Sequence, residues 1–257
     1  MSKQDVVIVT GASSGIGSEV ALELADKGYQ VLAVARREKL LRRLRSINPN
    51  IVPVTADLTT NKGLEAIHSR VAENDYRVRY LVHSAGSVYP VKPLVEISQE
   101  EWRKNLNLNL DATLFLTQKL LPFFDNTKVL MLSSDSAGNP RKGWSGYSVS
   151  KTALSALYET MKKELPPEQV SVGLVRPGPV ETAIAKIARN TPPDVFPDQA
   201  LFRQWKDDGK MINPGTVGKF ITWLLTETEH RDYSETAWDI RDESHHRHWL
   251  KGELCNS

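Results

Sequence analysis

The sequence predicts a single-domain α/β fold: a doubly wound, Rossmann-like parallel sheet with helices on both faces. Short apolar runs of strand length alternate with segments of helical spacing along most of the 257 residues. The apolar runs are continuous, which is typical of parallel strands buried on both faces. No linker, internal repeat or low-complexity tract divides the chain, so one domain is expected. Right-handed crossovers between successive strands then place helices on both sides of the sheet.

The first half of the chain contains the clearest strand–helix units. Residues 6–10 (VVIVT) form a short apolar run suited to a buried strand, and residues 18–27 have the spacing of a helix that ends at Gly28. The same alternation predicts strands at 30–35, 51–55 and 80–83, and helices at 39–45 and 64–73.

The second half contains two long helical patterns and the last strands. Helices are expected at 99–124 and 147–164, and strands at 128–132, 171–176 and 236–240. Residues 181–214, rich in proline and polar residues, follow the sixth strand at the carboxyl edge of the sheet, where open α/β sheets bind ligands. We expect them to be an irregular lid over the substrate, with a plain surface excursion as the alternative. Residues 241–257 are expected to be a polar tail.

Composition argues against several classes of protein. The net charge of +2 is too small to indicate a nucleic-acid partner, and no apolar run approaches the ~18 residues that span a bilayer. The single cysteine, Cys255, has no partner for an internal disulfide, which favours a reducing compartment. No signal-peptide pattern is present. We therefore expect a cytoplasmic protein that binds neither nucleic acid nor membrane.

A glycine-rich turn (TGASSGIG, residues 10–17) lies between the first expected strand and the first expected helix. Its glycines allow a tight turn and a close approach of the backbone to a pyrophosphate, and the helix N-terminus offers free N–H groups to phosphate. The spacing is GxxxGxG, not GxGxxG, so the position of the turn carries the prediction against an ordinary glycine-rich turn. The expected cofactor contacts are Gly11, Ser13, Ser14, Gly15, Ile16 and Gly17.

The end of the second expected strand predicts which nicotinamide cofactor binds. An acidic residue there would accept hydrogen bonds from the ribose 2′-hydroxyl of NAD, but this chain has Arg36 and Arg37, and no carboxylate before Glu38. A guanidinium matches a 2′-phosphate with two parallel hydrogen bonds. We therefore expect NADP(H), with Arg36 as the leading contact and Ser14 or Arg37 assisting. The alternative is that both arginines belong to the solvated face of the charged helix that follows.

Tyr147 and Lys151 stand four residues apart at the start of an expected helix, which puts both side chains on one face. An ammonium beside a phenol favours the phenolate, so Lys151 is expected to lower the pKa of Tyr147 from about 10 toward the working pH. Such a phenol can give or take a proton in carbonyl reduction or alcohol oxidation. The pair alone is common on helices, and further motifs make it specific.

Motifs along nearly the whole chain resemble the short-chain dehydrogenase/reductase family, in the same order and spacing. Besides the glycine turn they are Asp57-Leu58, His83-Ser84-Ala85-Gly86, Asn109, Ser134 thirteen residues before Tyr147, the YSVSK motif at 147–151, and the PGPVET segment at 177–182. The resemblance implies a catalytic set of Asn109, Ser134, Tyr147 and Lys151. It also implies cofactor contacts from Asp57, Leu58, Ala85, Gly86, Tyr147, Lys151, Pro177, Gly178, Val180 and Thr182.

The resemblance implies a role for each catalytic residue. Tyr147 is the general acid for reduction, Lys151 assists it and holds the nicotinamide ribose, and Ser134 donates a hydrogen bond to the substrate oxygen. Asn109 supports a proton relay through water, and the cofactor supplies the hydride. Ser84 departs from the family's usual Asn-Asn-Ala-Gly turn, so a local rearrangement is expected there.

The sequence indicates the substrate less sharply. Asn139-Pro140 and the GWSGY segment at 143–147 resemble the sepiapterin reductase and benzil reductase branch, which reduces vicinal diketones and related carbonyls with NADPH. Trp144, Phe202 and Trp205 are expected to line an apolar or aromatic pocket, with ordinary packing as an equal alternative.

Two features near the C-terminus have more than one interpretation. Asp239, at the end of the last expected strand, would anchor a pterin by the same resemblance, or would be a surface carboxylate at a strand end. His245, His246 and His248 have the residue type of metal ligands, but two are adjacent and all lie in a polar stretch. No metal site is therefore expected, and a solvated tail is favoured.

The expected function is the NADPH-dependent reduction of a ketone, diketone or related carbonyl. An NADP-linked alcohol dehydrogenase running in the oxidative direction would use the same acid–base pair. A low-turnover nicotinamide-binding sensor is a further alternative, which the complete catalytic set argues against. The family commonly pairs subunits through two long helices, here near 106–124 and 147–163, so a homodimer or homotetramer is expected.

Overall fold

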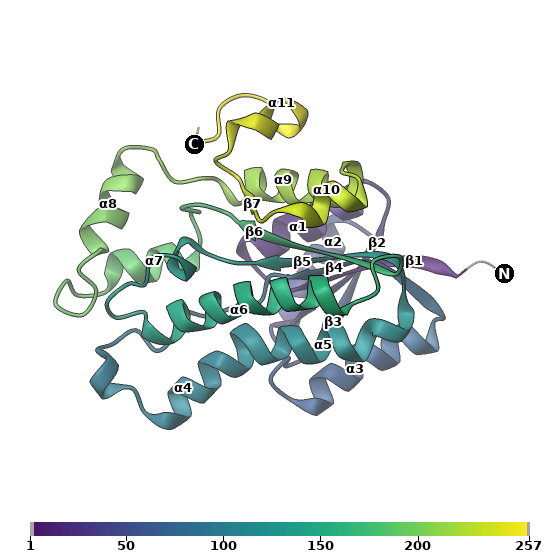
Figure 1. The fold of residues 1–257 in the computed structure, drawn as a ribbon, viewed down its shortest axis with the longest axis horizontal. Coiled ribbons are helices and arrows are strands. Elements are labelled where there is room, and N and C mark those ends of the chain that lie inside the picture. Colours follow the sequence, from purple (N-terminus) through teal and green to yellow (C-terminus); the bar gives the residue numbers. More distant parts are fainter. Residues whose placement is uncertain (1–2, 256–257) are drawn as a thin grey trace.

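Seven strands form one parallel sheet between two layers of helices (Figure 1), in a computed structural model that describes residues 3–255. The strand order is β3-β2-β1-β4-β5-β6-β7, and every neighbouring pair is parallel. The strand order changes direction at β1. β2 and β3 lie on one side of β1, and β4 to β7 lie on the other side. The doubly wound fold predicted from the sequence is therefore confirmed.

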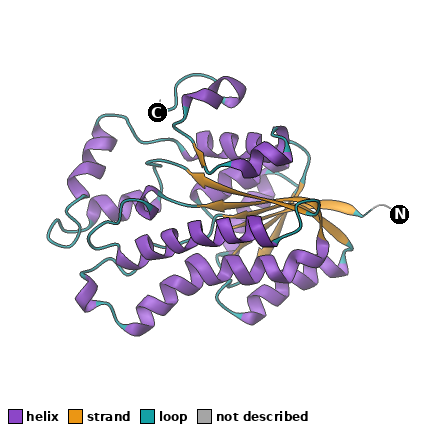
Figure 2. Cartoon of the chain, viewed as in Figure 1, coloured by secondary structure: helices purple, strands orange, loops and turns teal. Residues whose placement is uncertain are grey.

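The strands are β1 (Gln4–Thr10), β2 (Gln30–Ala35), β3 (Ile51–Thr55), β4 (Tyr76–His83), β5 (Phe124–Leu132), β6 (Val170–Arg176) and β7 (Trp238–Asp239). The helices are α1 (Gly15–Asp26), α2 (Glu38–Ile47), α3 (Asn61–Glu73), α4 (Gln99–Leu106), α5 (Ala112–Leu120), α6 (Ser145–Glu164), α7 (Ala183–Asn190), α8 (Gln199–Asp207), α9 (Pro214–Glu227), α10 (His230–Glu235) and α11 (His246–Trp249). Figure 2 shows how the helices enclose the strands.

Both faces of the sheet are buried. β1 turns Val7 and Val9 toward one face and Val6 and Ile8 toward the other, and all four are inaccessible to solvent. The first face packs against α1 and α9, and the second against α3, α5 and α6. Continuous apolar strands are therefore required, as the sequence pattern indicated.

The helix expected over 99–124 is interrupted. α4 passes into a π-helical turn at Asn107–Asp111, then into α5, and a 3₁₀ turn at Leu121–Phe123 leads directly into β5. A π turn holds one more residue than an α turn and commonly occurs at functional sites. Here it contains Asn109, which the resemblance placed in the catalytic set.

The expectation that residues 181–214 are irregular is wrong, because they contain α7 and α8. Ala188 of α7 and Phe202 of α8 are buried in a small apolar cluster with Trp144 and Phe196. Contacts with this cluster stabilise the two short helices. The prolines and polar residues of this stretch mask the helical spacing in the sequence. The sequence analysis also missed α9, which begins at Pro214.

The expectation of a solvated tail is also wrong for residues 243–249, which fold back onto α9. The His245 ring stacks on Phe220 at 5.0 Å between centroids and is only 6% exposed. Its Nδ1 accepts a hydrogen bond of 2.9 Å from Trp249 Nε1. Aromatic surface on α9 therefore anchors this segment, and residues 256–257 of the expected tail lie outside the described residues.

Within residues 3–255, no helix is both long and apolar enough to cross a membrane.

Candidate active site

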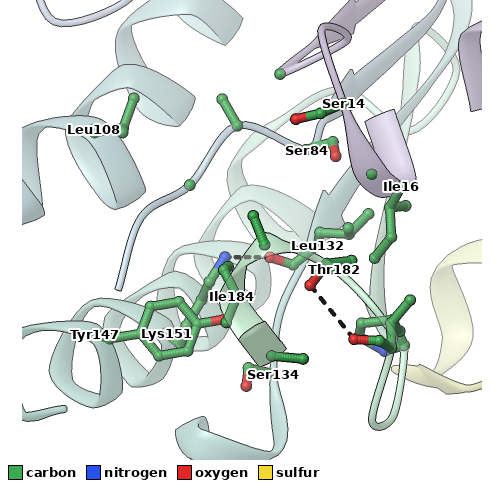
Figure 3. A pocket seen from close by; sticks show the side chains of 18 of the residues that line it. Ser14, Ile16, Ser84, Leu108, Leu132, Ser134, Tyr147, Lys151, Thr182 and Ile184 are labelled. Carbon is green, nitrogen blue, oxygen red and sulfur yellow. Dashed lines mark hydrogen bonds between the residues drawn. The ribbon is translucent and has the colours of Figure 1, made fainter. Parts of the chain in front are cut away.

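A cavity of about 350 Å³ lies at the carboxyl edge of the sheet, between the glycine turn and the start of α6 (Figure 3). It brings together most of the residues predicted from sequence. The predicted residues that line it are Gly11, Ser13, Ser14, Gly15, Ile16, Arg36, Arg37, Asp57, Leu58, Ala85, Gly86, Ser134, Trp144, Tyr147, Lys151, Pro177, Gly178, Val180, Thr182, Phe202 and Trp205. Gly17, Asn109 and Asp239 are not part of the lining.

The glycine turn packs closely against the end of β4. Gly11 has φ of +68°, and a Cβ there would lie 2.8 Å from Ala85 N and Cα. A Cβ on Gly17 would lie 2.6 Å from the Gly11 carbonyl oxygen. Gly17 does not line the cavity, but only glycine lets α1 pack this closely against the turn. α1 begins at Gly15 with no side-chain cap from Ser14 and no acidic residue in its first turn. Its N–H groups and partial positive charge therefore fit a phosphate.

The two arginines after β2 differ in their contacts. Arg37 Nε and Nη2 donate to Ser13 Oγ at 3.0 and 2.7 Å, and Nη2 also donates to Ser14 Oγ at 2.6 Å. Arg36 is 66% exposed, and its Nη1 lies 3.9 Å from Asp57 Oδ2. Arg37 is thus held on the glycine turn, whereas Arg36 is at the rim with a weaker partner.

Tyr147 and Ser134 meet in the inner part of the cavity (Figure 3). Tyr147 is 6% exposed, and burial raises the pKa of its phenol because the charged form loses solvation. The Ser134 side chain opposes this rise, since a hydroxyl that donates to the phenolate stabilises it and lowers the pKa. Tyr147 is therefore a protonated phenol at neutral pH, with a hydroxyl beside it.

Lys151 does not produce the effect on Tyr147 that the sequence predicted. Its Nζ donates to the Leu132 carbonyl at 2.6 Å and lies 5.7 Å from the centre of the Tyr147 ring. Burial lowers the pKa of Lys151 to about 8. The pKa of Tyr147 is raised, not lowered, because desolvation of the phenolate is the dominant effect in the structure.

Asn109 lies behind the cavity wall and not in it. It is 1% exposed, its Nδ2 donates to Ser87 O and to Ser150 Oγ, and its Oδ1 accepts from Ser87 N. A Cβ on Gly86 would lie 3.4 Å from Asn109 Oδ1 and 3.8 Å from Lys151 Nζ. The amide and the lysine therefore both lie close to Gly86.

The turn that departs from the family pattern is braced by Thr10. Ser84 N and Ala85 N both donate to Thr10 Oγ1, at 3.1 and 3.2 Å, and this hydroxyl donates to Val82 O. The turn at Ser84 is thus held by main-chain contacts to a hydroxyl on β1, and the rearrangement expected there stays a prediction.

Aromatic side chains close the side of the cavity that faces α7 and α8. Trp144 stacks on Phe196 at 4.7 Å and meets the edges of Tyr147 and Phe202 at 5.4 and 5.6 Å. Trp144 and Phe202 also line the cavity, so the two interpretations of Trp144, packing and pocket lining, both apply.

The sequence analysis missed Arg141. Its side chain is 9% exposed, pairs with Asp198 at the start of α8, and lies over the Phe202 and Trp205 rings at 5.5 and 6.0 Å. It joins the loop before α6 to the start of α8. No local pattern could have identified it, because its partners are some 57 or more residues away.

Asp239 lies at the end of β7, outside the cavity lining, with its carboxylate paired to Arg241. Both of its carboxylate oxygens accept hydrogen bonds from Arg241, at 2.7 to 3.0 Å. The pKa of Asp239 is low because these hydrogen bonds outweigh its partial burial, so it is ionised at neutral pH.

Comparison with known proteins places these features in context. A family model described as short chain dehydrogenase matches residues 5–193. Benzil reductase ((S)-benzoin forming) of Bacillus cereus is 30% identical over 235 residues, which cover 87% of this chain and 94% of the relative. A short-chain dehydrogenase/reductase structure from Saccharomyces cerevisiae superposes with a TM-score of 0.85 at 24% identity, covering 93% and 97% of the two chains. A short-chain dehydrogenase structure from Shigella flexneri, complexed with NADP, has a TM-score of 0.74 at 25% identity, covering 92% and 97%.

Proposed function

The chain belongs to the short-chain dehydrogenase family, and on that premise we propose that it reduces a ketone, diketone or related carbonyl with NADPH. The observation that carries the proposal is the convergence of Ser134, Tyr147 and Lys151 with the glycine turn on one cavity. A binding module would need the turn but not a buried phenol, hydroxyl and ammonium at the other end.

The cofactor would extend along the cavity from the glycine turn to Tyr147. The open backbone at Gly11 and the uncapped start of α1 would hold its pyrophosphate, and Arg36 and Arg37 would contact the 2′-phosphate. Asp57 is already engaged by Thr59, and the end of β2 offers no carboxylate to a 2′-hydroxyl, which favours NADP(H) over NAD(H). When bound, NADPH supplies the hydride.

The chain's own residues manage the proton and the developing charge. Tyr147, whose raised pKa keeps it protonated, gives its phenolic proton to the substrate oxygen as that oxygen gains negative charge. Ser134 donates a hydrogen bond to the same oxygen and orients the carbonyl. Lys151, with a pKa of about 8, is mostly protonated at neutral pH, and its ammonium would hold the nicotinamide ribose. Asn109, which packs behind Gly86, would support a proton relay through water.

The proposed substrate carries an apolar or aryl group beside the carbonyl. Trp144, Phe202 and Trp205 line the cavity next to Tyr147 and offer ring faces and edges to such a group. α7 and α8, tied down through Arg141, would form the lid over it. The similarity to a benzil reductase supports aryl diketones as the first compounds to test.

We further propose a cytoplasmic location. The single cysteine, which offers no pair for an internal disulfide, supports this location because reducing compartments keep thiols unpaired.

A steady-state assay with a carbonyl panel tests the proposal. NADPH consumption should be measured with benzil, other vicinal diketones, aryl ketones and aliphatic ketones, with NADH in parallel. We expect NADPH consumption that is fastest with the aryl compounds and is slower with NADH. Absence of NADPH consumption with every carbonyl of the panel would contradict the proposal.

A further inference from the structure

Arg241 reaches the active site from a distant part of the chain. It lies two residues after β7, where the C-terminal segment crosses the edge of the sheet (Figure 1). Its Nη1 and Nη2 donate to the two carboxylate oxygens of Asp135 at 3.0 and 2.7 Å. Its Nε and Nη2 donate to Asp239 at 2.8 and 2.7 Å. One guanidinium thus joins two carboxylates with fixed geometry.

Asp135 follows Ser134 directly and begins the 3₁₀ turn that fixes this hydroxyl. Ser134 Oγ accepts from Ser136 N at 3.2 Å, and Asp135 O accepts from Asn139 N at 2.9 Å. Asp135 and Ser134 both line the cavity. A bidentate hold on the Asp135 carboxylate therefore restrains the turn that aims the Ser134 hydroxyl.

Asp135 also acts on Tyr147 through its charge. The carboxylate raises the pKa of Tyr147, in addition to the larger effect of burial. Lys151 and Arg141 are the other charged groups at this end of the cavity, and Arg141 is already paired with Asp198. Neither is bonded to Asp135 in the residues described, so the positive charge that balances Asp135 comes from Arg241.

The position of Arg241 is fixed by the fold of the C-terminal segment. Ile240 N donates to Arg176 O at 3.1 Å, which continues the pairing of β7 with β6. The Trp249 indole can only donate, so His245 Nδ1 accepts its hydrogen bond and carries no proton. The proton of the His245 ring is therefore on Nε2, which donates to Asp239 O at 2.9 Å. Strand pairing on one side and this hydrogen-bond chain on the other hold Arg241 in place.

We propose that Arg241 is a positioning residue of the active site, which orients Ser134 and balances the charge of Asp135 beside Tyr147. This inference rests on the proposed function only where it predicts a change in the rate of carbonyl reduction. The charge balance itself is a property of the folded protein.

The test compares four variants: Arg241→Met, Arg241→Lys, Asp135→Asn and the double variant. The ionisation of Tyr147 is followed as the pH titration of tyrosinate absorbance, taken as the difference between each protein and its Tyr147→Phe counterpart. Arg241→Met should move this ionisation to higher pH, because Asp135 is left without a partner. Arg241→Lys should leave it near the wild-type position. Asp135→Asn should move it to lower pH than in the wild type, because the carboxylate that raises the pKa of Tyr147 is gone, and the double variant should titrate at lower pH than Arg241→Met.

Asp239→Asn is the matched control, since it removes the other carboxylate of Arg241 and should move the titration little. In the assay for carbonyl reduction, Arg241→Met should lower kcat about 2- to 5-fold at neutral pH, and Asp135→Asn should restore part of the loss. An unchanged titration in Arg241→Met, or equal shifts in Asp239→Asn and Asp135→Asn, would overturn the inference.

The titration needs no substrate, so it remains decisive if no carbonyl is reduced and the proposed function fails. If Arg241→Met does not fold, as judged by thermal melting, Asp135→Asn decides alone. If Tyr147 then ionised at the same pH in Asp135→Asn as in the wild type, the proposed charge balance would be refuted.

Discussion

Replacing Arg36 with alanine should weaken NADPH selectively. A hydrogen bond between a guanidinium and a phosphate contributes about 1.5–3 kcal/mol, which corresponds to about 10- to 150-fold in affinity. The Arg36 side chain is 66% exposed and its one ionic partner lies at 3.9 Å, so screening by solvent places the loss near the lower bound, about tenfold. NADH, which has no 2′-phosphate, should bind with nearly unchanged affinity.

Arg37→Ala should weaken both cofactors. This guanidinium holds Ser13 and Ser14 of the glycine turn, so its loss loosens the pyrophosphate site in addition to removing a charge. Arg43→Ala, on the exposed face of α2, is the matched control and should change neither affinity.

Fluorescence titration with NADPH and NADH measures all of these affinities directly. Equal weakening of both cofactors by Arg36→Ala would refute its assignment to the 2′-phosphate. No effect of either arginine on NADPH would assign both to the solvated face of α2.

Three other features give predictions of their own. Burial lowers the pKa of His83 from 6.5 to about 3. Between these two pH values the unfolded chain binds a proton that the folded protein does not bind. The free energy of unfolding should therefore fall as the pH drops from about 6.5 toward 3. His83→Asn should reduce that pH dependence in urea unfolding, and an identical dependence would contradict the assignment. Lys128 Nζ donates to Leu224 O and Thr228 O at the end of α9, so Lys128→Met should destabilise the fold by about 2–4 kcal/mol, against little change for Lys162→Met. We also propose a dimer through α5 and α6, where Phe115 and Val149 are 49% and 46% exposed; light scattering should give at least twice the chain mass, and a monomer for Phe115→Asp with Val149→Asp. A monomeric wild-type protein would rule out that interface.

The sequence predicts the central sheet well because its strands are apolar runs with clear ends. The bounds of β2 and β3 agree with the prediction, since each run begins and ends beside polar or turn-forming residues. Most of the cavity lining was also predicted, because the glycine turn and the spacing of Ser134, Tyr147 and Lys151 are local patterns whose elements end at the same edge of the sheet.

What the sequence does not predict depends on contacts between distant residues. α9 was missed partly because Gly215 and Gly218 weaken its helical pattern, yet a Cβ on Gly218 would lie 2.9 Å from Glu19 Cβ of α1. That close approach of two helices requires glycine. The raised pKa of Tyr147 follows from burial, which spacing along a helix cannot show.

The partners of Arg241 could not be predicted either, because Asp135 is 106 residues away in the chain. The folding of the C-terminal segment on α9 likewise depends on ring stacking between His245 and Phe220, which only the tertiary structure brings together.

The turnover of Tyr147→Phe, measured with NADPH and a carbonyl that the wild-type protein reduces, tests the central claim most directly. Tyr158→Phe is the matched control on the same helix, where the hydroxyl donates to Ser234 O at 3.3 Å, away from the cavity. The account predicts that kcat falls by about 10²–10⁴-fold in Tyr147→Phe while NADPH affinity and the control stay near wild type. Turnover of Tyr147→Phe within a few-fold of wild type would contradict it.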